Sequence, residues 1–243
     1  MKYPFVIAIA TVLLFVSCTK DDHIVPPVVK PPQGIDLNIS YHVDNAPFVT
    51  NSFIYSTQAG YSYNLTTLVY YISEVNLIKA DSSNVLIKDY QYLDALSSAT
   101  NQLSLKDIPV GNYIGLKFNI GLDAIHNKSF ALPSTTENVN MQWPDMMGGG
   151  YHMMKLEGNY KDLSGTYGFA MHLGTDTCLV PVKLFKSISI IKDAKTAIHL
   201  KMNINEWFRN PNQFDFNIDG NYIMGNITNM MKISKNGVDV FSF

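Results

Sequence analysis

Apolar and polar residues alternate along most of this chain. Near its start, Ile35, Leu37, Ile39 and Tyr41 are each followed by a polar residue. Because successive side chains of a β-strand point to opposite faces, this period of two predicts a strand with one buried face. Similar runs rich in Val, Ile, Tyr and Phe, separated by turn residues, predict further strands at residues 65–80, 85–93, 111–120, 150–157, 167–173, 183–191 and 196–203.

Helical periodicity is confined to two short pieces, residues 205–208 and 221–231. The chain has no internal repeat, and its strands do not alternate with long helices. We therefore predict an all-β fold, an antiparallel β-sandwich or flattened barrel with short helical pieces near the C-terminus.

The first residues have the pattern of a bacterial lipoprotein leader. Lys2 is followed by an apolar run at residues 5–15, which is too short to cross a bilayer stably. The run ends in Ser17-Cys18, which resembles a lipobox, so we expect a signal peptide at 1–17 and lipid on Cys18. The acidic stretch at 19–22 resembles a surface-export signal of Bacteroidetes-type bacteria. The expected location is the outer membrane, facing the periplasm or the cell surface.

The proline-rich sequence HIVPPVVKPP at 23–32 predicts an extended tether, so residues 18–33 would form the acylated cysteine and its tether. One β domain then spans 34–243. Without residues 1–17, the chain has 17 basic and 20 acidic residues, a net charge of −3, and we expect no nucleic-acid partner. Beyond a lipidated Cys18 only Cys178 remains, which excludes an intramolecular disulfide.

The motifs of common enzymes are missing from the sequence. It contains no Gly-x-Ser-x-Gly, His-Glu-x-x-His or Cys-x-x-Cys motif. The glycines 148–150 precede Tyr151 rather than the Lys-Ser/Thr pair of a phosphate-binding loop. We therefore predict a binding protein and not an enzyme.

The histidines are the candidate metal ligands, because imidazole is the commonest ligand of transition metals in proteins. His199 falls on the polar side of its strand, where a solvated role is favoured. His126 follows a strand in a loop, where a surface role or a supporting role beside a metal ligand is at least as favoured as coordination. His42, His152 and His172 are the three stronger candidates.

His152 and His172 lie on two predicted strands that flank a polar stretch, residues 158–166, and these strands read as a hairpin. If the hairpin is centred on Asp162, His152 lies directly opposite His172. Opposed Cβ atoms stand about 4.5–5.5 Å apart, so two imidazoles could converge on one ion. The alternative is a pair of histidines that is merely hydrogen-bonded at a strand end, and spacing alone leaves both open.

Several methionines lie close to these histidines in the sequence: Met146, Met147 and Met154. Thioethers beside imidazoles favour copper, particularly Cu(I), over calcium or magnesium. The alternative is that these side chains fill the core.

Six segments together resemble the MbnP-like family of bacterial copper-associated proteins, which includes a Bacteroidetes lipoprotein branch. They are LVYYISEVNLIKAD (68–81), GNYIGLKFNIGLD (111–123), WPDMMGGGYHMMKLEG (143–158), FAMHLGTDTC (169–178), NINEWFRNP (203–211) and ISKNGVDVFSF (233–243). The resemblance implies a β-rich extracytoplasmic copper-binding domain. It also implies a partner, an MbnH-like di-haem cytochrome c peroxidase, which in relatives oxidises a tryptophan to kynurenine beside the copper site.

Carried over to this chain, the resemblance implies that His42, His152 and His172 are metal ligands. Trp143 becomes the candidate for oxidation, or a residue of the pocket. This chain departs from the methanotroph members at two points: Trp143-Pro144 replaces a Phe-Trp-x-Trp pattern, and Cys178 replaces a four-cysteine pattern.

We therefore expect a lipid-anchored protein that captures or handles copper at the cell envelope, with Met146, Met147 and Met154 shaping the pocket. One alternative is a surface lipoprotein that binds a protein or glycan without metal. Another is a redox partner whose Trp143 is the substrate of the peroxidase.

Overall fold

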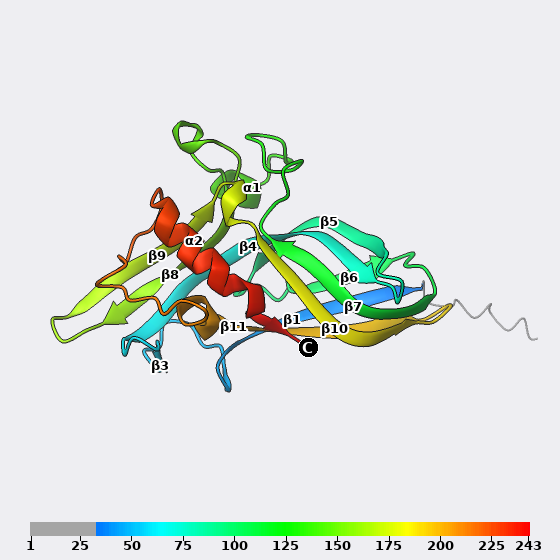
Figure 1. Cartoon of the computed structure of the whole chain (residues 1–243), viewed down its shortest axis with the longest axis horizontal. Coiled ribbons are helices and arrows are strands. Elements are labelled where there is room, and N and C mark those ends of the chain that lie inside the picture. Colours follow the sequence, from blue (N-terminus) through cyan, green and yellow to red (C-terminus); the bar gives the residue numbers. More distant parts are fainter. Residues whose placement is uncertain (1–32) are drawn as a thin grey trace, which may run out of the picture. The chain divides into compact units, whose positions relative to one another are not determined.

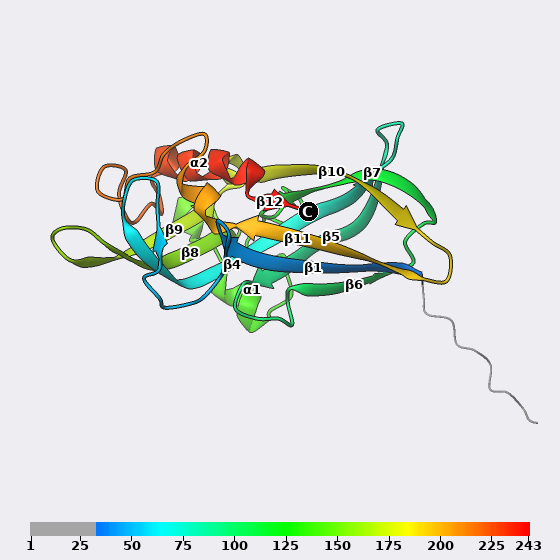
Figure 2. The ribbon, with the colours of Figure 1, turned by 90° about the horizontal axis from the view of Figure 1, so that it is seen from below.

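The computed structural model describes residues 33–243, which fold into two packed β-sheets (Figures 1 and 2). The first sheet contains β1 (Gly34–Val43), β2 (Ala46–Pro47), β6 (Gln102–Lys106), β11 (Lys195–Asn203) and β12 (Phe241–Ser242). The second contains β3 (Tyr55–Ser56), β4 (Ser62–Ile78), β5 (Asn84–Asp94), β7 (Gly111–Ile120), β8 (His152–Lys161), β9 (Thr166–Gly174) and β10 (Val180–Ile190). The all-β prediction is confirmed, and the arrangement is a sandwich rather than a closed barrel.

One pairing differs from the antiparallel pattern that we expected. β1 and β11 run parallel, from Gly34 beside Lys195 to His42 beside Asn203. Figure 2 shows β11, β1 and β6 side by side, with β1 between its parallel and antiparallel neighbours. Alternation within each strand indicates which face is buried, but it carries no information about which distant strand lies alongside.

The helical elements are short. The predicted piece at 205–208 is the 3-10 helix η3 (Ile204–Phe208). The second predicted piece starts later than expected, as α2 (Ile227–Asn236), because Asn226 caps it by accepting a hydrogen bond from Asn229 N. Three further short elements, which we did not predict, follow β7 and β9: α1 (Thr136–Asn140), η1 (Asp145–Met147) and η2 (Asp176–Cys178). A fourth, η4 (Gly237–Asp239), precedes β12.

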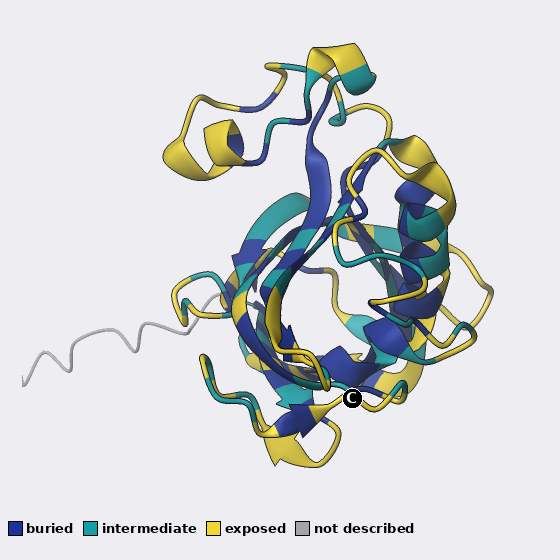
Figure 3. Cartoon of the chain, turned by 90° about the vertical axis from the view of Figure 1, so that its left-hand side faces the viewer, coloured by how far each residue is buried: buried dark blue, intermediate teal, exposed yellow. Residues whose placement is uncertain are grey.

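The core lies between the inner faces of the two sheets, where the buried residues gather in Figure 3. Two tyrosines meet there across the sheets: the hydroxyl groups of Tyr41 and Tyr70 are 2.9 Å apart. Tyr41 also donates to Asn101 Oδ1 at 2.9 Å. Leaving a buried hydroxyl without a partner costs about 1–3 kcal/mol, so this chain of hydrogen bonds fixes how the sheets face each other.

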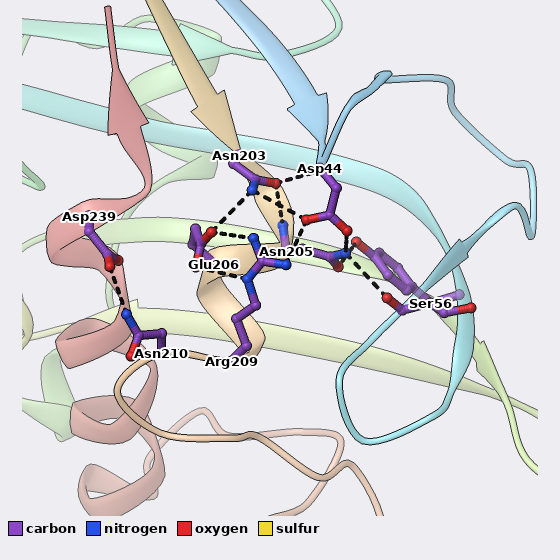
Figure 4. A network of polar contacts seen from close by, with 9 residues as sticks. Asp44, Ser56, Asn203, Asn205, Glu206, Arg209, Asn210 and Asp239 are labelled. Atoms are coloured by element: carbon purple, nitrogen blue, oxygen red, sulfur yellow. Dashed lines mark hydrogen bonds and ion pairs between the residues drawn. The ribbon is translucent and has the colours of Figure 1, made fainter.

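A second polar network joins the turn after β1 to η3 (Figure 4). Asn205 is buried, accepts a hydrogen bond from Tyr63 Oη at 2.7 Å and donates to Asp44 Oδ2 at 2.6 Å. Arg209 bonds to both Asp44 and Glu206, which places one cation between two carboxylates. These contacts hold the C-terminal ends of β1 and β11 together, next to His42.

The long strand β4 positions the rest of the second sheet. Its first half pairs with β8, and its second half pairs with β5 on one edge and β7 on the other. The β8–β9 hairpin therefore pairs with a central strand whose position is fixed by β5 and β7. Both strands of this hairpin bear a candidate ligand, His152 on β8 and His172 on β9.

The predicted leader, Cys18 and the tether as far as Pro32 lie outside the described residues. Within residues 33–243, no helix is both long enough and apolar enough to span a bilayer.

Candidate metal centre

The register of the β8–β9 hairpin differs from the one that we predicted. Lys161 pairs with Thr166, so the hairpin is centred between Leu163 and Ser164 rather than on Asp162. Asp162 instead begins the turn, where its Oδ1 accepts from the N–H groups of Ser164 and Gly165 at 2.7 and 3.0 Å. The prediction failed because the polar stretch was taken wholly as loop, whereas the strands continue into it on both sides.

As a result, His152 lies opposite Gly174, and His172 lies opposite Lys155. The ladder is irregular between His152 and Met154, so one residue of β8, Met153, has no opposed partner on β9. His172 is two residues from Gly174 and thus on the same face as His152. The two imidazole rings are diagonal neighbours, with centroids 5.1 Å apart and planes at 87°.

His152 is 5% exposed, and its tautomer follows from its contacts. Nδ1 is 3.1 Å from the carbonyl oxygen of Met141, which can only accept, so Nδ1 must carry the proton. Nε2 is then left with a lone pair, and it is buried without a hydrogen-bond partner. Burial, helped by the nearby charge of Lys155, lowers the pKa of His152 to about 4, which keeps the ring neutral.

His172 is oriented in a similar way by a carboxylate. Its Nε2 is 2.7 Å from Glu157 Oε1, which leaves Nδ1 as the nitrogen that could bind a ligand. The hydrogen bond from His172 lowers the pKa of Glu157, so the carboxylate stays ionised. A ring nitrogen held by a carboxylate or a backbone carbonyl is the usual second contact of metal-binding histidines. Both histidines have this contact.

Trp143 lies beside the pair, 3% exposed, with its ring centroid 4.8 Å from that of His152. The chain reaches this position through a tight turn: Trp143 N donates to Gly150 O at 2.9 Å, and Gly148, Gly149 and Gly150 all have positive φ. Residues that carry a side chain rarely adopt a positive φ, which explains the run of three glycines. The indole N–H donates to the carbonyl oxygen of Met147 at 3.1 Å.

The indole rests on the backbone of β9 at Gly174. A Cβ atom at this position would lie 2.4 Å from two indole carbons, so only glycine leaves room for the ring. Trp143, His152 and His172 therefore form a row across the outer face of the hairpin.

A profile of the MbnP family matches residues 32–230, most of the described chain. The chain belongs to the MbnP family. The solved structure of MbnP from Methylosinus trichosporium superposes with a TM-score of 0.52 over 74% of this chain and 79% of that one. At 11% identity this likeness concerns the fold alone. A search of curated proteins found no match.

In this MbnP-family chain, the third predicted ligand does not lie with the other two. His42 is on β1 in the opposite sheet, between Pro47 and Asn203, and its Nε2 is 3.2 Å from Ser40 Oγ. Within residues 33–243, no group of three or more His, Cys, Asp or Glu side chains is placed to hold a metal ion. The structure thus brings His152 and His172 together but leaves His42 elsewhere.

The three methionines that we predicted to line the pocket have three different environments. Met146 is 93% exposed, and Met154 is fully buried opposite Tyr70 on the inner side of β8. Met147 is partly buried, and its Cε would lie 2.9 Å from a Cβ at Gly225. Only the backbone carbonyl of Met147 contacts the row, through Trp143.

Sequence reasoning did not assign Glu157 and Gly174 to this centre, although both belong to the pattern. Glu157 is two residues from Lys155 and so shares its face with His172, which the correct register would have shown. Gly174 follows His172 and Leu173 in the sequence His-Leu-Gly, where a glycine inside a strand signals close approach of another group. Two other histidines of the described residues have different surroundings: His126 Nδ1 is 2.7 Å from Asp123 Oδ2, and His199 is exposed as expected.

Proposed function

We propose that this protein binds one copper ion, as Cu(I), at His152 and His172 and handles copper at the cell envelope without turnover. One observation carries the proposal: the buried Nε2 of His152 has a free lone pair and no partner, and a second oriented imidazole lies beside it. An unpaired acceptor inside a protein is costly, and a bound ion would satisfy it.

The donor set of the site fits copper better than a hard cation. The row offers two imidazole nitrogens, His152 Nε2 and His172 Nδ1, and its carboxylate, Glu157, is already hydrogen-bonded to His172. Calcium and magnesium require several oxygen ligands, whereas imidazole suits copper and zinc. A site with so few donors favours Cu(I), which accepts low coordination. Copper supplies no step here beyond its own binding and release.

Trp143 gives the site a route to a further ligand. We propose that a partner di-haem peroxidase of the MbnH type oxidises Trp143 to kynurenine, whose new amino and carbonyl groups would lie beside His152. The test is the intact mass of protein from its native host. Two equivalents of peroxide, the oxidant of the peroxidase, open the indole to N-formylkynurenine and leave as water, and hydrolysis then releases one ring carbon as formate. The side chain thus loses one carbon and gains one oxygen in net, and an unchanged Trp143 in copper-bound protein would contradict this step.

We further propose that the mature protein is anchored in the outer membrane by lipid on Cys18. Replacing Cys18 with Ser should release the protein from the membrane fraction and abolish metabolic labelling with a radioactive fatty acid. Equal labelling of the variant and the natural protein would refute the anchor. Copper binding by the folded domain does not depend on this outcome.

Titration of the purified protein with Cu(I), against a competing chelator of known affinity, tests the copper site. One equivalent should bind, and the double variant His152→Ala, His172→Ala should bind at least about a hundredfold more weakly, because even supporting contacts are worth ten- to a hundredfold in affinity. His199→Ala, an exposed histidine on the outer face of β11, is the matched control and should leave affinity unchanged. Undiminished binding by the double variant would refute the site.

His42→Ala provides a separate comparison. If copper binds at the row alone, this variant should retain the affinity of the natural protein, because His42 lies in the other sheet. A loss as large as that of the double variant would show instead that all three histidines act on one ion.

A further inference from the structure

A second candidate site lies along the free edge of β5. This strand pairs with β4 along one edge only, from Asn84 to Asp94, and no other described strand pairs with it. A groove of about 700 Å³ borders seven consecutive residues of β5, from Leu86 to Tyr92. Thr100 and the residues around the start of α1, Thr135, Glu137 and Asn138, line the same groove.

The backbone of β5 turns alternate peptide groups toward this groove. Asp94 N donates to Thr100 Oγ1 at 2.9 Å and so points away from β4. Because the N–H groups of an antiparallel strand alternate between its two edges, the N–H groups of Tyr92 and Tyr90 also point away from β4. The carbonyl groups of Asp94 and Tyr92 accept from the side chains of Asn101 and Gln91. Within residues 33–243, the N–H groups of Tyr90 and Tyr92 make no hydrogen bond outside the β4–β5 ladder, and the alternation turns both away from that ladder.

We propose that this edge binds an extended segment of another polypeptide, which adds a strand to the second sheet. Edge strands that are open in this way pair readily with other chains. Residues 84–94 contain no proline, and their only irregularity is a register shift near Lys88. Lys88 and Asp89 are the charges within the grooved stretch. From Lys88 to Tyr92 the edge is regular.

The size of the groove is closer to that of one extended chain than to that of a helix. Seven residues at about 3.3 Å each span about 23 Å, so a volume of about 700 Å³ corresponds to a cross-section of about 30 Å². A strand within a sandwich occupies about 48 Å², from strand and sheet spacings of about 4.8 and 10 Å. A helix about 10 Å wide needs about 80 Å². A bound helix or a second folded domain therefore fits poorly.

The charges of the groove indicate what the segment should carry. Asp89 and Glu137 provide two carboxylates against the single ammonium group of Lys88. A basic side chain on the bound segment would complement this excess of negative charge. Leu86, which is 53% exposed at one end, offers an apolar contact.

The proposal is tested by selecting peptides from a phage-displayed library of random heptapeptides. The selected peptides are then synthesised, and their binding is measured by fluorescence anisotropy. The natural protein should enrich peptides that contain a basic residue. Tyr90→Pro should weaken their binding at least about tenfold, because it removes one outward N–H while leaving the ladder with β4 intact. Tyr90→Ala is the matched control: it also lacks the ring but keeps the N–H, and should bind within about threefold of the natural protein.

Amide hydrogen exchange on the natural protein gives a second readout that does not depend on how the variants fold. A bound peptide should slow exchange at Tyr90 and Tyr92, while unbound protein exchanges these amides freely. Glu137→Trp, which fills the groove from its exposed rim, should abolish binding.

Any of three outcomes would overturn the proposal. The natural protein could enrich no more peptides than the Glu137→Trp variant does, Tyr90→Pro and Tyr90→Ala could bind the peptides equally well, or a bound peptide could leave amide exchange at Tyr90 and Tyr92 unchanged. If oligosaccharides on a glycan array bind the natural protein but not Glu137→Trp, the ligand of the groove is a sugar and the peptide proposal is wrong. Copper affinity should be the same in all these variants, since none of them touches the row.

Discussion

Replacing Gly174 with Ala tests how closely Trp143 packs on β9. The new Cβ would lie 2.4 Å from the indole atoms Cδ2 and Cε3, whereas carbon atoms normally stay about 3.5–4.0 Å apart. The ring must therefore move by more than about 1 Å, and overpacking of this kind costs about 1–3 kcal/mol. Alanine also restricts the unfolded chain, which offsets about 0.4–1 kcal/mol. We expect a net loss of about 1–2 kcal/mol in the free energy of unfolding.

Urea denaturation measures this loss, and Gly165→Ala is its control. Gly165 lies in the turn of the same hairpin, and a Cβ there would meet nothing closer than Tyr167 Oη at 3.6 Å. That variant should be as stable as the natural protein or up to about 1 kcal/mol more stable. The two substitutions therefore differ in what the methyl group meets and not in the residue exchanged.

The indole N–H resonance of Trp143 provides a local readout. The chain has two tryptophans, so Trp207, whose buried ring lies beside Gly237, supplies an internal reference in the same spectrum. Gly174→Ala should shift the Trp143 signal and leave that of Trp207 in place. Equal stability of the two glycine variants, together with an unmoved Trp143 signal, would refute the packing of the indole on Gly174.

Two further predictions concern the free energy of unfolding of the metal-free protein. Because burial lowers the pKa of His152 to about 4 against about 6.5 in an unfolded chain, the unfolded state takes up its proton first as the pH falls. Protonation of His152 in the unfolded state should therefore lower the free energy of unfolding by about 3 kcal/mol as the pH falls from 6.5 to 4. In His152→Phe the free energy of unfolding, measured by denaturation, should depend less steeply on pH, and equal slopes for the two proteins would contradict this. Asn205→Leu should lower the free energy of unfolding by about 2–4 kcal/mol, because it leaves Tyr63 Oη and Ser56 O without their partner. Asp44→Ala should lower it by less than about 1 kcal/mol, because the Asp44 side chain is half-exposed. Thermal unfolding that ranks the two variants the other way would show that Asn205 does not anchor the network.

Much of the fold could be predicted from short-range pattern. The alternation at 35–41 became β1, and the run at 111–120 became β7 with the same limits. These predictions succeeded because a strand with one buried face must alternate, whatever its neighbours are. The short strand β6 was missed because five residues give too little alternation to distinguish it from a loop.

Pairing could not be predicted in the same way. The parallel contact of β1 with β11 joins residues about 160 positions apart, and nothing local to either strand specifies it. The start of α2 was misplaced because residues 221–223 bond to Ala170 of β9 instead of forming a first helical turn. Such contacts between distant segments override a helical pattern.

The candidate site divides along the same line. The sequence by itself determined that His152 and His172 lie on neighbouring strands, since this follows from residue type and spacing. Only the tertiary structure decided that the rings meet diagonally, that Gly174 makes room for Trp143, and that His42 lies in the other sheet. The reason is that a strand has period two: a shift of the hairpin centre changes every opposed pair, and the centre is set by the hydrogen bonds of the Asp162 turn.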